Sequence, residues 1–405
     1  MVEFGCRVYG QENVLAADFS VGSRRISDPK FRSLSQYSVR PGDVLVTMMG
    51  SSGAVGVVPV GAAPGIIDSH LLRLRTDPEI LNGQFLRWFL GESTVARAEA
   101  ELQSRGTIMA GLNSGVVRSL TVPVPPLQAQ AAIADFLDRK TAAIDALIEK
   151  KERLLELLAE KRAALIHHAV TKGLDPDVPM KDSGVPWIGE IPAHWEVLPF
   201  RRLITSLEQG SSPVASDRSA DPDEFAVLKL SCVSDGRFVP SEHKALPDTS
   251  VARRLLAAQA GDLLITRANT PLLVGDTCVV ARNHPRRLLP DLIYRVRLRS
   301  DRADPEYVSS FLRSPSGRAQ VEADARGSSA SMVKISQSHI RDWCVPAPPT
   351  PEQESIRDAI RTLRGKVDEV RSRLGSQVRR LHEYRQALIT AAVTGQVDVS
   401  GECPA

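Results

Sequence analysis

The sequence has few aromatic residues, no paired cysteines and no long apolar run. Aromatic residues make up only 5% of the chain, and its five cysteines are single and widely spaced. Cysteines that are single, odd in number and without a Cys-x-x-Cys pair argue against a disulfide framework and a zinc cluster, so we expect reduced thiols. No apolar stretch approaches the roughly 18 residues of a membrane span, and no basic-then-apolar signal opens the chain. These absences predict a cytoplasmic protein.

The charge balance also lacks a dominant sign. Lys and Arg total 51 against 48 Asp and Glu, a formal net charge of +3. A strongly basic balance would indicate a nucleic-acid partner, but the net charge of this chain is close to zero for its length. Any positive face must therefore arise from segregation of charge on the surface. The 405 residues, 42% of them apolar, are typical of a soluble protein with two to four domains.

The usual catalytic motifs are missing as well. There is no GxxxxGK[ST], no GxGxxG after a strand, no HExxH and no GxSxG. The glycine-rich stretch 50–56 lacks the lysine of a phosphate loop, so it favours a turn or bulge. His167 and His168 fit favourable charge near a helix C-terminus better than a ligand or general base. The Gly-Asp turns at Asp43 and Asp262 fit turn-closing carboxylates better than catalytic ones. We predict no catalytic residue, no metal site and no bound cofactor.

The chain instead contains a long internal repeat. The segment Val122-Pro-Val-Pro-Pro-Leu-Gln-Ala-Gln-Ala-Ala-Ile133 recurs as Val345-Pro-Ala-Pro-Pro-Thr-Pro-Glu-Gln-Glu-Ser-Ile356, 223 positions later. The same offset holds for nearly fifty residues. It aligns Asp145 with Asp368 and Arg162 with Arg385. The chain is therefore predicted to be a duplicated unit.

Each copy of the repeat predicts a long amphipathic helix. About forty residues correspond to about 60 Å of helix. For the second helix we expect Thr350 as N-cap, Pro351 in the first turn and Gln353 three residues after the cap. The apolar stripes have the three-and-four spacing of a coiled coil, which predicts an antiparallel pair; the alternative is that each helix packs on its own globular domain. The expected seam residues are Ile133, Leu137, Ile144, Leu147, Leu154, Leu158 and Leu165, and Ile356, Ile360, Leu363, Val367, Val370, Leu374, Val378, Leu381 and Leu388.

The halves that precede the helices match more loosely. Pro41-Gly-Asp43-Val-Leu-Val-Thr47 parallels Ala260-Gly-Asp262-Leu-Leu-Ile-Thr266, a turn into a buried strand. Each half is expected to end in a strand, Leu120 to Val124 in the first and Trp343 to Ala347 in the second. The expected organisation is a first domain at 1–123, a helix at 124–172, a linker at 173–194, a second domain at 195–346, a helix at 347–395 and a tail at 396–405.

The repeated residues resemble a known family. Gln130, Ile-Ala-Asp-Phe-Leu-Asp138, Thr141-Ala-Ala-Ile-Asp-Ala-Leu-Ile148 and Val170-Thr-Lys-Gly-Leu174 resemble the conserved region of the specificity subunit of type I restriction–modification systems. Trp187-Ile-Gly-Glu-Ile-Pro-Ala-His-Trp-Glu-Val197 resembles the segment that opens a target-recognition domain in that family. The resemblance covers essentially the whole chain.

The resemblance implies a non-catalytic DNA-binding subunit. The implied α/β (or α+β) fold has two globular target-recognition domains separated by two long helices in an antiparallel coiled coil, a pseudo-twofold repeat. Each domain would bind half of a split, asymmetric target in double-stranded DNA, with the helices fixing the spacer. The implied partners are two methyltransferase subunits and two restriction or translocase subunits. S-adenosylmethionine, ATP and Mg would belong to those partners.

The residues that contact DNA are predicted from side-chain chemistry. Phosphates attract Arg and Lys, and base edges are read by Arg, Asn and Gln, with Ser and Thr able to contact any base. The candidates in the first domain are Arg24, Arg25, Arg105, Thr107 and Asn113. Those in the second are Arg267, Asn269, Arg326, Ser328 and Lys334.

The two domains are not expected to be equivalent. The first has no Trp-Glu-Val opening, and about 25 residues before Asp262 have no counterpart before Asp43. The first domain is therefore either naturally shorter or begins late, and we expect it to lack its first strand. The alternatives are an inactive or exchangeable recognition cassette with a truncated first domain, and a coiled-coil scaffold without a DNA role.

Overall fold

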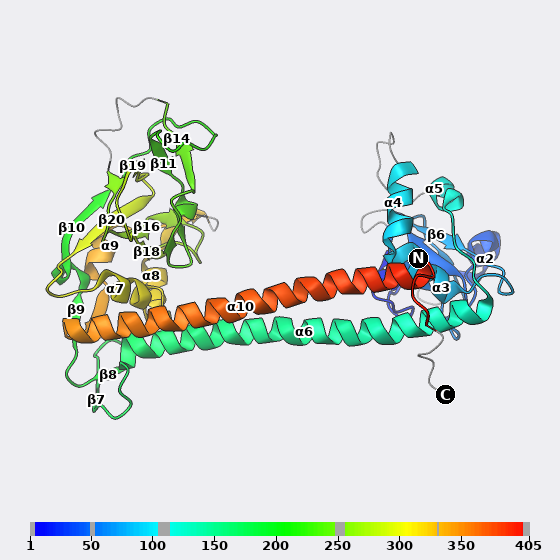
Figure 1. The fold of residues 1–405 in the computed structure, drawn as a ribbon, viewed down its shortest axis with the longest axis horizontal. Helices are drawn as coiled ribbons and strands as arrows, with labels where there is room; N and C mark the ends of the chain where they lie inside the picture. The colour runs from blue at the N-terminus through cyan, green and yellow to red at the C-terminus, as the bar shows by residue number, and fades with distance from the viewer. Residues whose placement is uncertain (1–4, 49–52, 104–113, 248–255, 330–331, 400–405) are drawn as a thin grey trace. The chain divides into compact units, whose positions relative to one another are not determined.

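The chain folds as two compact units that share two long helices. The structure, a computed structural model, describes residues 5–48, 53–103, 114–247, 256–329 and 332–399. Unit 1 comprises Met1–Leu154 with Arg373–Ala405, and unit 2 comprises Leu155–Ser372. The helices are α6 (Leu127–Lys172) and α10 (Thr350–Val393), and each contributes one part to each unit (Figure 1).

Unit 2 is built on two small sheets. The first is antiparallel, in the order β10 (Ile204–Gln209), β20 (Ile293–Leu298), β16 (Leu263–Thr266) and β18 (Thr277–Val279). The second has the order β14 (His243–Ala245), β11 (Ala226–Leu228), β19 (His284–Leu288) and β15 (Ala257–Ala258).

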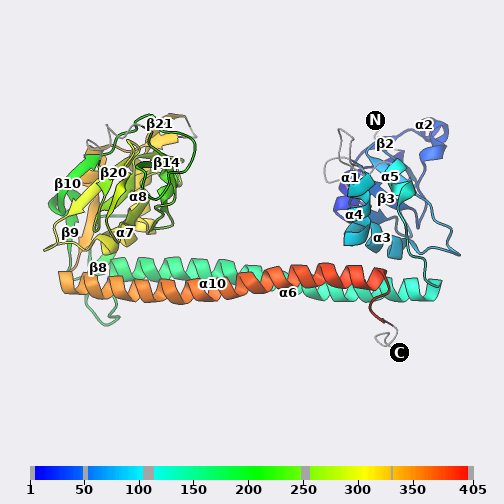
Figure 2. The ribbon, with the colours of Figure 1, turned by 45° about the horizontal axis from the view of Figure 1, so that its top comes forward.

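The strand β16 separates two apolar clusters of unit 2. Leu263 and Ile265 pack in the cluster that holds α7 (Pro305–Leu312), whereas Leu264 packs with Leu228 and Leu289 on the other face. The alternation follows from the period of two in a strand. In Figure 2, α7 lies between the sheet and α10.

The remaining elements of unit 2 are short. They are β7 (Met180–Asp182), β8 (Glu190–Pro192), β9 (Glu196–Pro199), η2 (Phe200–Arg202), η3 (Leu230–Cys232), β12 (Val233–Ser234), β13 (Arg237–Phe238), β17 (Ala268–Asn269), α8 (Pro315–Asp324), β21 (Arg326–Ser329), β22 (Met332–Lys334), α9 (Gln337–Asp342) and β23 (Cys344–Ala347).

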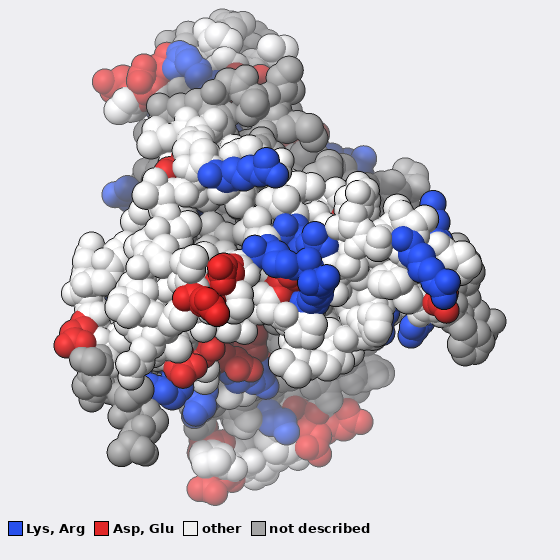
Figure 3. All heavy atoms as spheres, turned by 90° about the vertical axis from the view of Figure 1, so that its right-hand side faces the viewer, with Lys and Arg blue, Asp and Glu red and all other residues white. Residues whose placement is uncertain are grey.

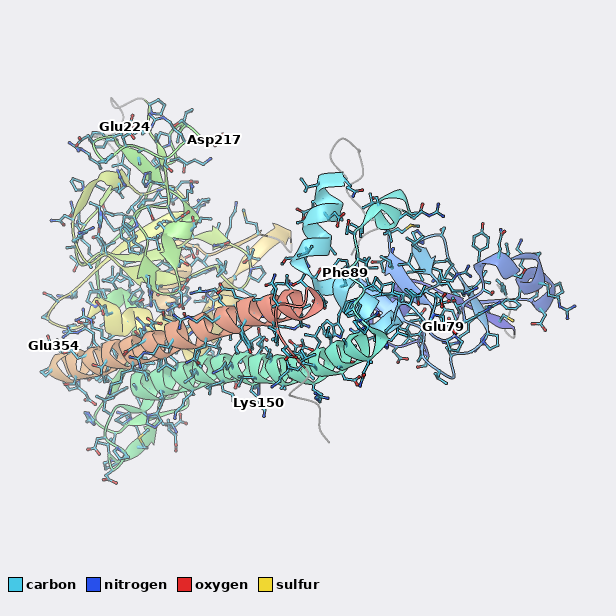
Figure 4. All side chains as sticks on the ribbon, turned by 45° about the vertical axis from the view of Figure 1, so that its right-hand side comes forward. Glu79, Phe89, Lys150, Asp217, Glu224 and Glu354 are labelled. Carbon is cyan, nitrogen blue, oxygen red and sulfur yellow. The ribbon has the colours of Figure 1, made fainter. Side chains whose placement is uncertain are left out.

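Unit 1 repeats this plan with fewer strands. Its first sheet is β4 (Val55–Val57), β3 (Val44–Thr47) and β6 (Leu71–Leu74), and its second is β2 (Arg25–Ile26), β1 (Cys6–Tyr9) and β5 (Gly65–Ile67). The helix α3 (Gly83–Glu92) takes the place of α7, and its Phe89 is buried in one cluster with Ile389 of α10 (Figure 4). The other elements are α1 (Gln11–Leu15), α2 (Asp28–Ser33), η1 (Ser35–Tyr37), α4 (Thr94–Gln103) and α5 (Ser114–Ser119).

The two long helices run antiparallel within each unit. In unit 1, Arg385 bonds Asp145 at 2.9 Å and Lys151 donates to Gln377 at 2.8 Å, so the numbering rises on one helix as it falls on the other. In unit 2, Arg162 lies 3.9 Å from Asp368. The repeat aligns Asp145 with Asp368 and Arg162 with Arg385. The same ion pair therefore occurs twice, with the roles of the two helices exchanged.

The buried stripe of α6 differs in part from the expected seam. Ile133, Leu137 and Ile144 are buried, but Leu147 and Leu154 are 43% and 44% exposed, and α6 buries Ile148 instead. Leu165 is 43% exposed, and the stripe continues through the partly buried Leu155, Leu158 and Ile166. The error arose because apolar residues stand in adjacent pairs, while the polar Thr141 occupies a buried position by donating to the Leu137 carbonyl.

The stripe of α10 follows the expectation more closely. Ile356, Ile360 and Val367 are buried, and Leu363, Leu374, Val378, Leu381 and Leu388 are partly buried. Val370 is 42% exposed, so its placement in the seam was wrong. The exposed Lys150 shows where the solvent side of α6 lies (Figure 4).

A buried glutamine joins the start of each long helix to its globular part. Gln130 Nε2 donates to the carbonyls of Ile80 and Pro125, and its Oε1 accepts from the Asn82 amide. Gln353 repeats this set with Arg302, Pro348 and Asp304, at 2.8–2.9 Å. Asn82 and Asp304 are the N-caps of α3 and α7. Each glutamine therefore fixes the short helix and the long helix to one another.

This tie replaces the expected N-cap of α10. The amide of Gln353 donates to the Pro349 carbonyl, and the Thr350 hydroxyl donates to the Asp301 carbonyl at 3.2 Å. Thr350 is the first residue of the helix and does not accept from Gln353, so its assignment as N-cap was wrong. The Gln353 side chain points inward because it forms hydrogen bonds with three buried backbone groups, which would otherwise be unpaired.

Two further segments differ from expectation. Residues 120–124 form no strand, whereas the matching β23 pairs with β9. A strand exists only with a partner, and unit 1 has no counterpart of β9 in the described residues. The expected linker at 173–194 is folded, because β7 and β8 pair and Ile188 and Ile191 are buried in the core of unit 2. The expected domain boundaries themselves stay a prediction.

Candidate nucleic-acid interface

A buried carboxylate fixes the strand that leads to the candidate DNA contacts of unit 2. Asp262 is 1% exposed; it accepts from the Gln259 amide at 2.8 Å and from Arg297 Nε at 3.1 Å. In unit 1, Asp43 accepts from the Arg40 amide and from Arg75 in the same way, at 2.7–2.8 Å. The Gly-Asp turn is therefore a structural device, as its sequence indicated, and it also holds an arginine of the neighbouring strand.

The end of β16 is held equally firmly. The buried hydroxyl of Thr266 donates to the Leu273 carbonyl at 2.7 Å and accepts from the Asp276 amide at 3.0 Å. The segment that follows, Arg267 to Val274, contains the short strand β17, and these bonds close its two ends. A segment that leaves a rigid strand end is a common position for a binding residue. Arg267 is the first residue of this segment.

A small sheet brings the candidates of the second domain together. Its order is β17, β22, β21, with Ala268 opposite Lys334, Asn269 opposite Val333 and Arg326 also opposite Lys334. The Ile335 amide donates to the Arg267 carbonyl at 3.0 Å, so Arg267 adjoins the same sheet. Residues from two segments far apart in the sequence thus lie on neighbouring strands. The sequence singled out each segment, but not their pairing.

The described candidate side chains of this sheet differ in exposure and in their bonding partners. Lys334 is exposed. Arg267 is 29% exposed and lies 3.8 Å from Asp291, and Asn269 Oδ1 accepts from the Thr270 amide at 2.9 Å. Arg326 and Ser328 belong to β21, but their side chains lie outside the described residues.

The candidates of the first domain are not brought together among the described residues. Arg24 is held between Glu12 and Asp68 at 2.8 and 2.9 Å, so its charge is neutralised. Arg25 donates to the Gly5 carbonyl at 3.1 Å. Arg105, Thr107 and Asn113 lie outside the described residues.

One basic group was missed from the sequence. Arg282, Arg286 and Arg287 line a groove together with His284 and Phe225. Arg286 pairs with Asp223 at 2.5 Å, while Arg282 is exposed. Burial lowers the pKa of His284, and the charges of Arg282 and Arg287 lower it further. The sequence signal for this group is the basic run Ala281-Arg-Asn-His-Pro-Arg-Arg287. A count of basic and acidic residues over the whole domain does not reveal it, because the two kinds nearly balance.

Acidic residues offset much of the remaining positive charge. Asp217 and Glu224, labelled in Figure 4, pair with Lys244 and Arg218 at 2.6 and 2.7 Å. On the face drawn in Figure 3, basic side chains lie in several separate groups among uncharged and acidic ones. On this face, therefore, the positive charge is divided among separate groups.

Groups that often carry catalysis have structural surroundings here. Burial lowers the pKa of His167, and its buried Nδ1 has no hydrogen-bond partner in the part of the chain that the structure describes. The expected favourable charge near the helix end therefore does not apply to His167. Burial raises the pKa of the Cys232 thiol to about 12. Over the described ranges, no three His, Cys, Asp or Glu residues are grouped to hold a metal ion. Among the helices that the structure describes, none has the length and apolarity of a membrane span.

Comparison with known proteins finds sequences similar to this chain. Residues 24–157 match the family model described as the type I restriction modification DNA specificity domain. The chain is 29% identical to the EcoEI specificity subunit of Escherichia coli over 233 residues, covering 57% of this chain and 39% of that subunit. It is 25% identical to the EcoKI specificity subunit of Escherichia coli K12, over 91% of this chain and 78% of that one. The chain is thus similar in sequence to type I restriction–modification specificity subunits, the family that the repeated residues indicated.

The fold agrees with that similarity. A chain from a structure described as the "structural basis underlying complex assembly and conformational transition of the type I R-M system" superimposes with a TM-score of 0.62. The sequence identity is 17%, and the match covers 88% of this chain and 82% of the other. Two domains with two long helices are therefore the fold of this chain, as the sequence predicted.

Proposed function

We propose that this chain is a sequence-specific DNA-binding subunit of a type I restriction–modification complex. In this proposal each unit reads one half of a bipartite target in double-stranded DNA, and the two halves differ in sequence. The chain itself carries out no catalysis; it directs adenine methylation or restriction by partner subunits in the cytoplasm.

The observation that carries the proposal is a repeated framework whose described candidate contact residues differ between the two units. The buried Gln130 and Gln353 make the same three bonds, and Asp43 and Asp262 each hold a turn and an arginine. By contrast, Arg24 is neutralised by two carboxylates in unit 1, while Lys334 is exposed in unit 2. A duplicated frame with different surfaces suits a split, asymmetric target, because protein symmetry maps onto two half-sites.

In unit 2, the proposed interface is the sheet β17-β22-β21 with Arg267 at its edge. Arg267, Asn269 and Arg326 would contact base edges, and Ser328 and Lys334 would contact bases or phosphates. The groove of Arg282, Arg286 and Arg287 would add phosphate contacts. In unit 1, Arg25, Arg105, Thr107 and Asn113 remain the proposed contacts. Arg24 is the weakest of the original candidates, because two carboxylates already hold it.

The proposed partners are two methyltransferase subunits and two restriction or translocase subunits. Two copies of each suit a chain whose helix pair carries the same ion pair twice, Arg385 with Asp145 and Arg162 with Asp368. A repeated surface offers two equivalent docking positions. S-adenosylmethionine, ATP and Mg would be bound by those partners.

The test is a methylation map of host DNA with and without this chain. The chain is co-produced with the methyltransferase subunit of its own system, and N6-methyladenine is located across the genome. A split motif methylated only when the chain is present is the expected result. A stable complex with no methylation would favour an inactive recognition cassette. Failure to bind either DNA or methyltransferase would favour a coiled-coil scaffold, and both outcomes contradict the proposal.

A further inference from the structure

A pocket of unit 2, where its parts of the two long helices meet the globular part, is lined by four arginines. Its cavity has a volume of about 130 Å³. The arginines come from four places in the fold: α6, β13, the corner between α7 and α8, and α10. They are Arg162, Arg237, Arg313 and Arg364, and among the described residues Asp235 is the one carboxylate that lines the pocket.

Two of the arginines already occupy the nearest carboxylates. Arg313 donates to Asp235 at 2.7 Å, and Arg237 bonds Asp368 of α10. Arg162 is left with longer contacts, 3.6 Å to Asp235 and 3.9 Å to Asp368. Its side chain is nevertheless only 18% exposed. Arg162 is therefore largely withdrawn from water without a carboxylate at hydrogen-bond distance.

Arg364 has still fewer partners. Among the described residues, its guanidinium makes one hydrogen bond, from Nη2 to the Ser310 hydroxyl at 3.4 Å, and no ion pair. Burial lowers the pKa of Arg364, and the positive charges of Arg313 and Arg162 lower it further, although two carboxylates act in the opposite direction. The charged form of this partly buried side chain is thus less stable here than in water.

The pocket as a whole has an excess of positive charge. Arg313 also bonds Asp276 at 2.8 Å, so four guanidiniums face three carboxylates among the described residues. A guanidinium has five N–H donors, and burial removes the water that would otherwise accept from them. The donors of Arg162 and Arg364 therefore favour an added anion.

Unit 1 neutralises the equivalent arginine from within the chain. The repeat places Arg385 at the position of Arg162. Arg385 bonds Asp145 at 2.9 Å and Glu92 at 3.0 Å. Two close carboxylates thus balance this arginine in unit 1, whereas Arg162 has none at hydrogen-bond distance in unit 2.

The counterpart of Glu92 in unit 2 is a basic residue. The Ser93 hydroxyl accepts from an amide of the first turn of α4, and the Ser314 hydroxyl does the same for α8. The residue directly before this serine is Glu92 in unit 1 and Arg313 in unit 2. The same corner therefore carries opposite charge in the two units.

The position of Arg364 differs in the same sense. The repeat places Thr141 there in unit 1, and its hydroxyl donates to the Leu137 carbonyl at 2.6 Å. At these two positions unit 2 has guanidiniums where unit 1 has a carboxylate and a hydroxyl. Unit 1 thus supplies an anion to the repeated arginine from this corner, and unit 2 does not.

We propose that the pocket of unit 2 binds a phosphate group, held by Arg162 and Arg364. The phosphate balances Arg162 as Glu92 balances Arg385 in unit 1. Phosphate suits the pocket better than a carboxylate, because its several acceptor oxygens bond guanidiniums that come from different helices. The group belongs either to a free phosphate compound or to the DNA backbone. The pocket shares no residue with the sheet β17-β22-β21, and phosphate binding does not depend on the proposed function.

The experiment titrates the full chain with inorganic phosphate by calorimetry, at constant ionic strength and without DNA. One saturable site is expected. Arg364→Gln is expected to weaken phosphate binding about tenfold, because a charge-assisted bond is lost. Arg371→Gln is the matched control, since Arg371 is exposed on the same helix and outside the pocket lining, and it should leave phosphate binding unchanged.

A second measurement needs no altered pocket. Phosphate is expected to raise the Tm of the unaltered chain above its value in chloride of equal ionic strength, because a ligand that binds the folded state stabilises it. Hydrogen exchange should slow around Arg162 and Arg364 and stay unchanged around Arg385, which Glu92 already balances.

Duplex DNA separates the two sources of the phosphate group. If the backbone supplies it, duplex displaces inorganic phosphate, and Arg364→Gln lowers the salt slope of duplex binding by about one. If a free compound supplies it, saturating duplex leaves phosphate binding unchanged. Either result supports the site. Absence of saturable phosphate binding, equal binding by the unaltered and Arg364→Gln chains, or equal weakening by Arg364→Gln and Arg371→Gln overturns the proposal. Loss of specific DNA binding alone would contradict the proposed function and leave this site standing.

Discussion

Unit 1 and unit 2 share their buried polar bonds and differ in what surrounds them. Both have a Gly-Asp turn with a buried carboxylate, a capped short helix and a glutamine that ties that helix to a long one. Among the described residues, unit 2 also has β9 and β10 and presents the sheet β17-β22-β21 beside Arg267. Each bond of such a buried network depends on the others, whereas peripheral strands and loops can change separately. The difference therefore separates the shared frame of the two units from the proposed reading surface of unit 2.

The largest expected effect is loss of the turn carboxylate in unit 2. Asp262→Ala leaves the Gln259 amide and the Arg297 guanidinium without their acceptor. We expect a loss of about 3 kcal/mol of unfolding free energy, because the Gln259 amide and Arg297 lose their acceptor and the buried Arg295, 4.0 Å from Asp262, loses one of its two nearby carboxylates. Denaturant unfolding measures the loss, and hydrogen exchange in β16 assigns it to unit 2.

The matched comparisons are Asp43→Ala and Asp217→Ala. Asp43→Ala should destabilise β3 instead of β16. The exposed Asp217 pairs with Lys244 on the surface, so its loss should cost little and fall near the small effect typical of exposed ion pairs. Similar losses for Asp262 and Asp217 would show that the turn is not part of a shared frame.

Removal of the glutamine ties comes next in size. Gln353→Ala leaves the Arg302 and Pro348 carbonyls and the Asp304 amide unpaired in a buried site. The expected loss is about 2–3 kcal/mol of unfolding free energy, with a comparable loss in unit 1 for Gln130→Ala. Gln128 is exposed on α6, and Gln128→Ala should change stability by less than about 0.5 kcal/mol. Thermal and denaturant unfolding give all three values; a loss for Gln128 equal to that for Gln130 would refute the tie.

A binding measurement tests the proposed reading surface of unit 2. Arg267→Ala should weaken specific DNA binding by about 1–3 kcal/mol and relax the choice of base at one position. The control is Arg299→Ala, since Arg299 is exposed just past the opposite end of β20. Unchanged affinity and unchanged target choice in a competition assay would remove Arg267 from the interface.

The smallest expected effect concerns pH. Burial lowers the pKa of His167 below its ordinary value, so the folded chain binds this proton less readily than the unfolded chain. Its contribution to stability is therefore present at neutral pH and lost as the pH falls through about 6.5. His167→Gln should flatten the decline of unfolding free energy between about pH 7 and 5. The repeat places Thr390 at the position of His167 in unit 1, so the effect is expected in unit 2. Equal slopes for the His167→Gln variant and the unaltered chain would exclude it.

The architecture was predictable because its signals are local and occur twice. The repeat around Gln130 and Gln353 indicated both long helices, and the Gly-Asp turns indicated β3 and β16.

The wrong predictions of individual residues and short segments share a physical cause. Adjacent apolar residues such as Leu147 and Ile148 satisfy two helical registers, and only packing selects between them. Residues 120–124 have the composition of a strand, but a strand also needs a partner. Gln353 fits a capping motif, but its side chain bonds instead to three backbone groups outside the helix.

The candidate interface was predictable in its segments and not in its assembly. Arg267 and Lys334 were singled out separately, and their closeness depends on the pairing of β17 with β22, which spacing in the sequence does not encode. The run around Arg282 was overlooked because acidic residues elsewhere balance the charge of the domain.

The most direct test of the central claim is an exchange of one unit's reading part. Residues 195–346 are replaced by the equivalent part of a specificity subunit with a different target, and N6-methyladenine is mapped in cells that also produce the methyltransferase subunit. If each unit reads one half-site, one half of the split motif changes while the other half stays the same. A change in both halves, or in neither, would contradict the account.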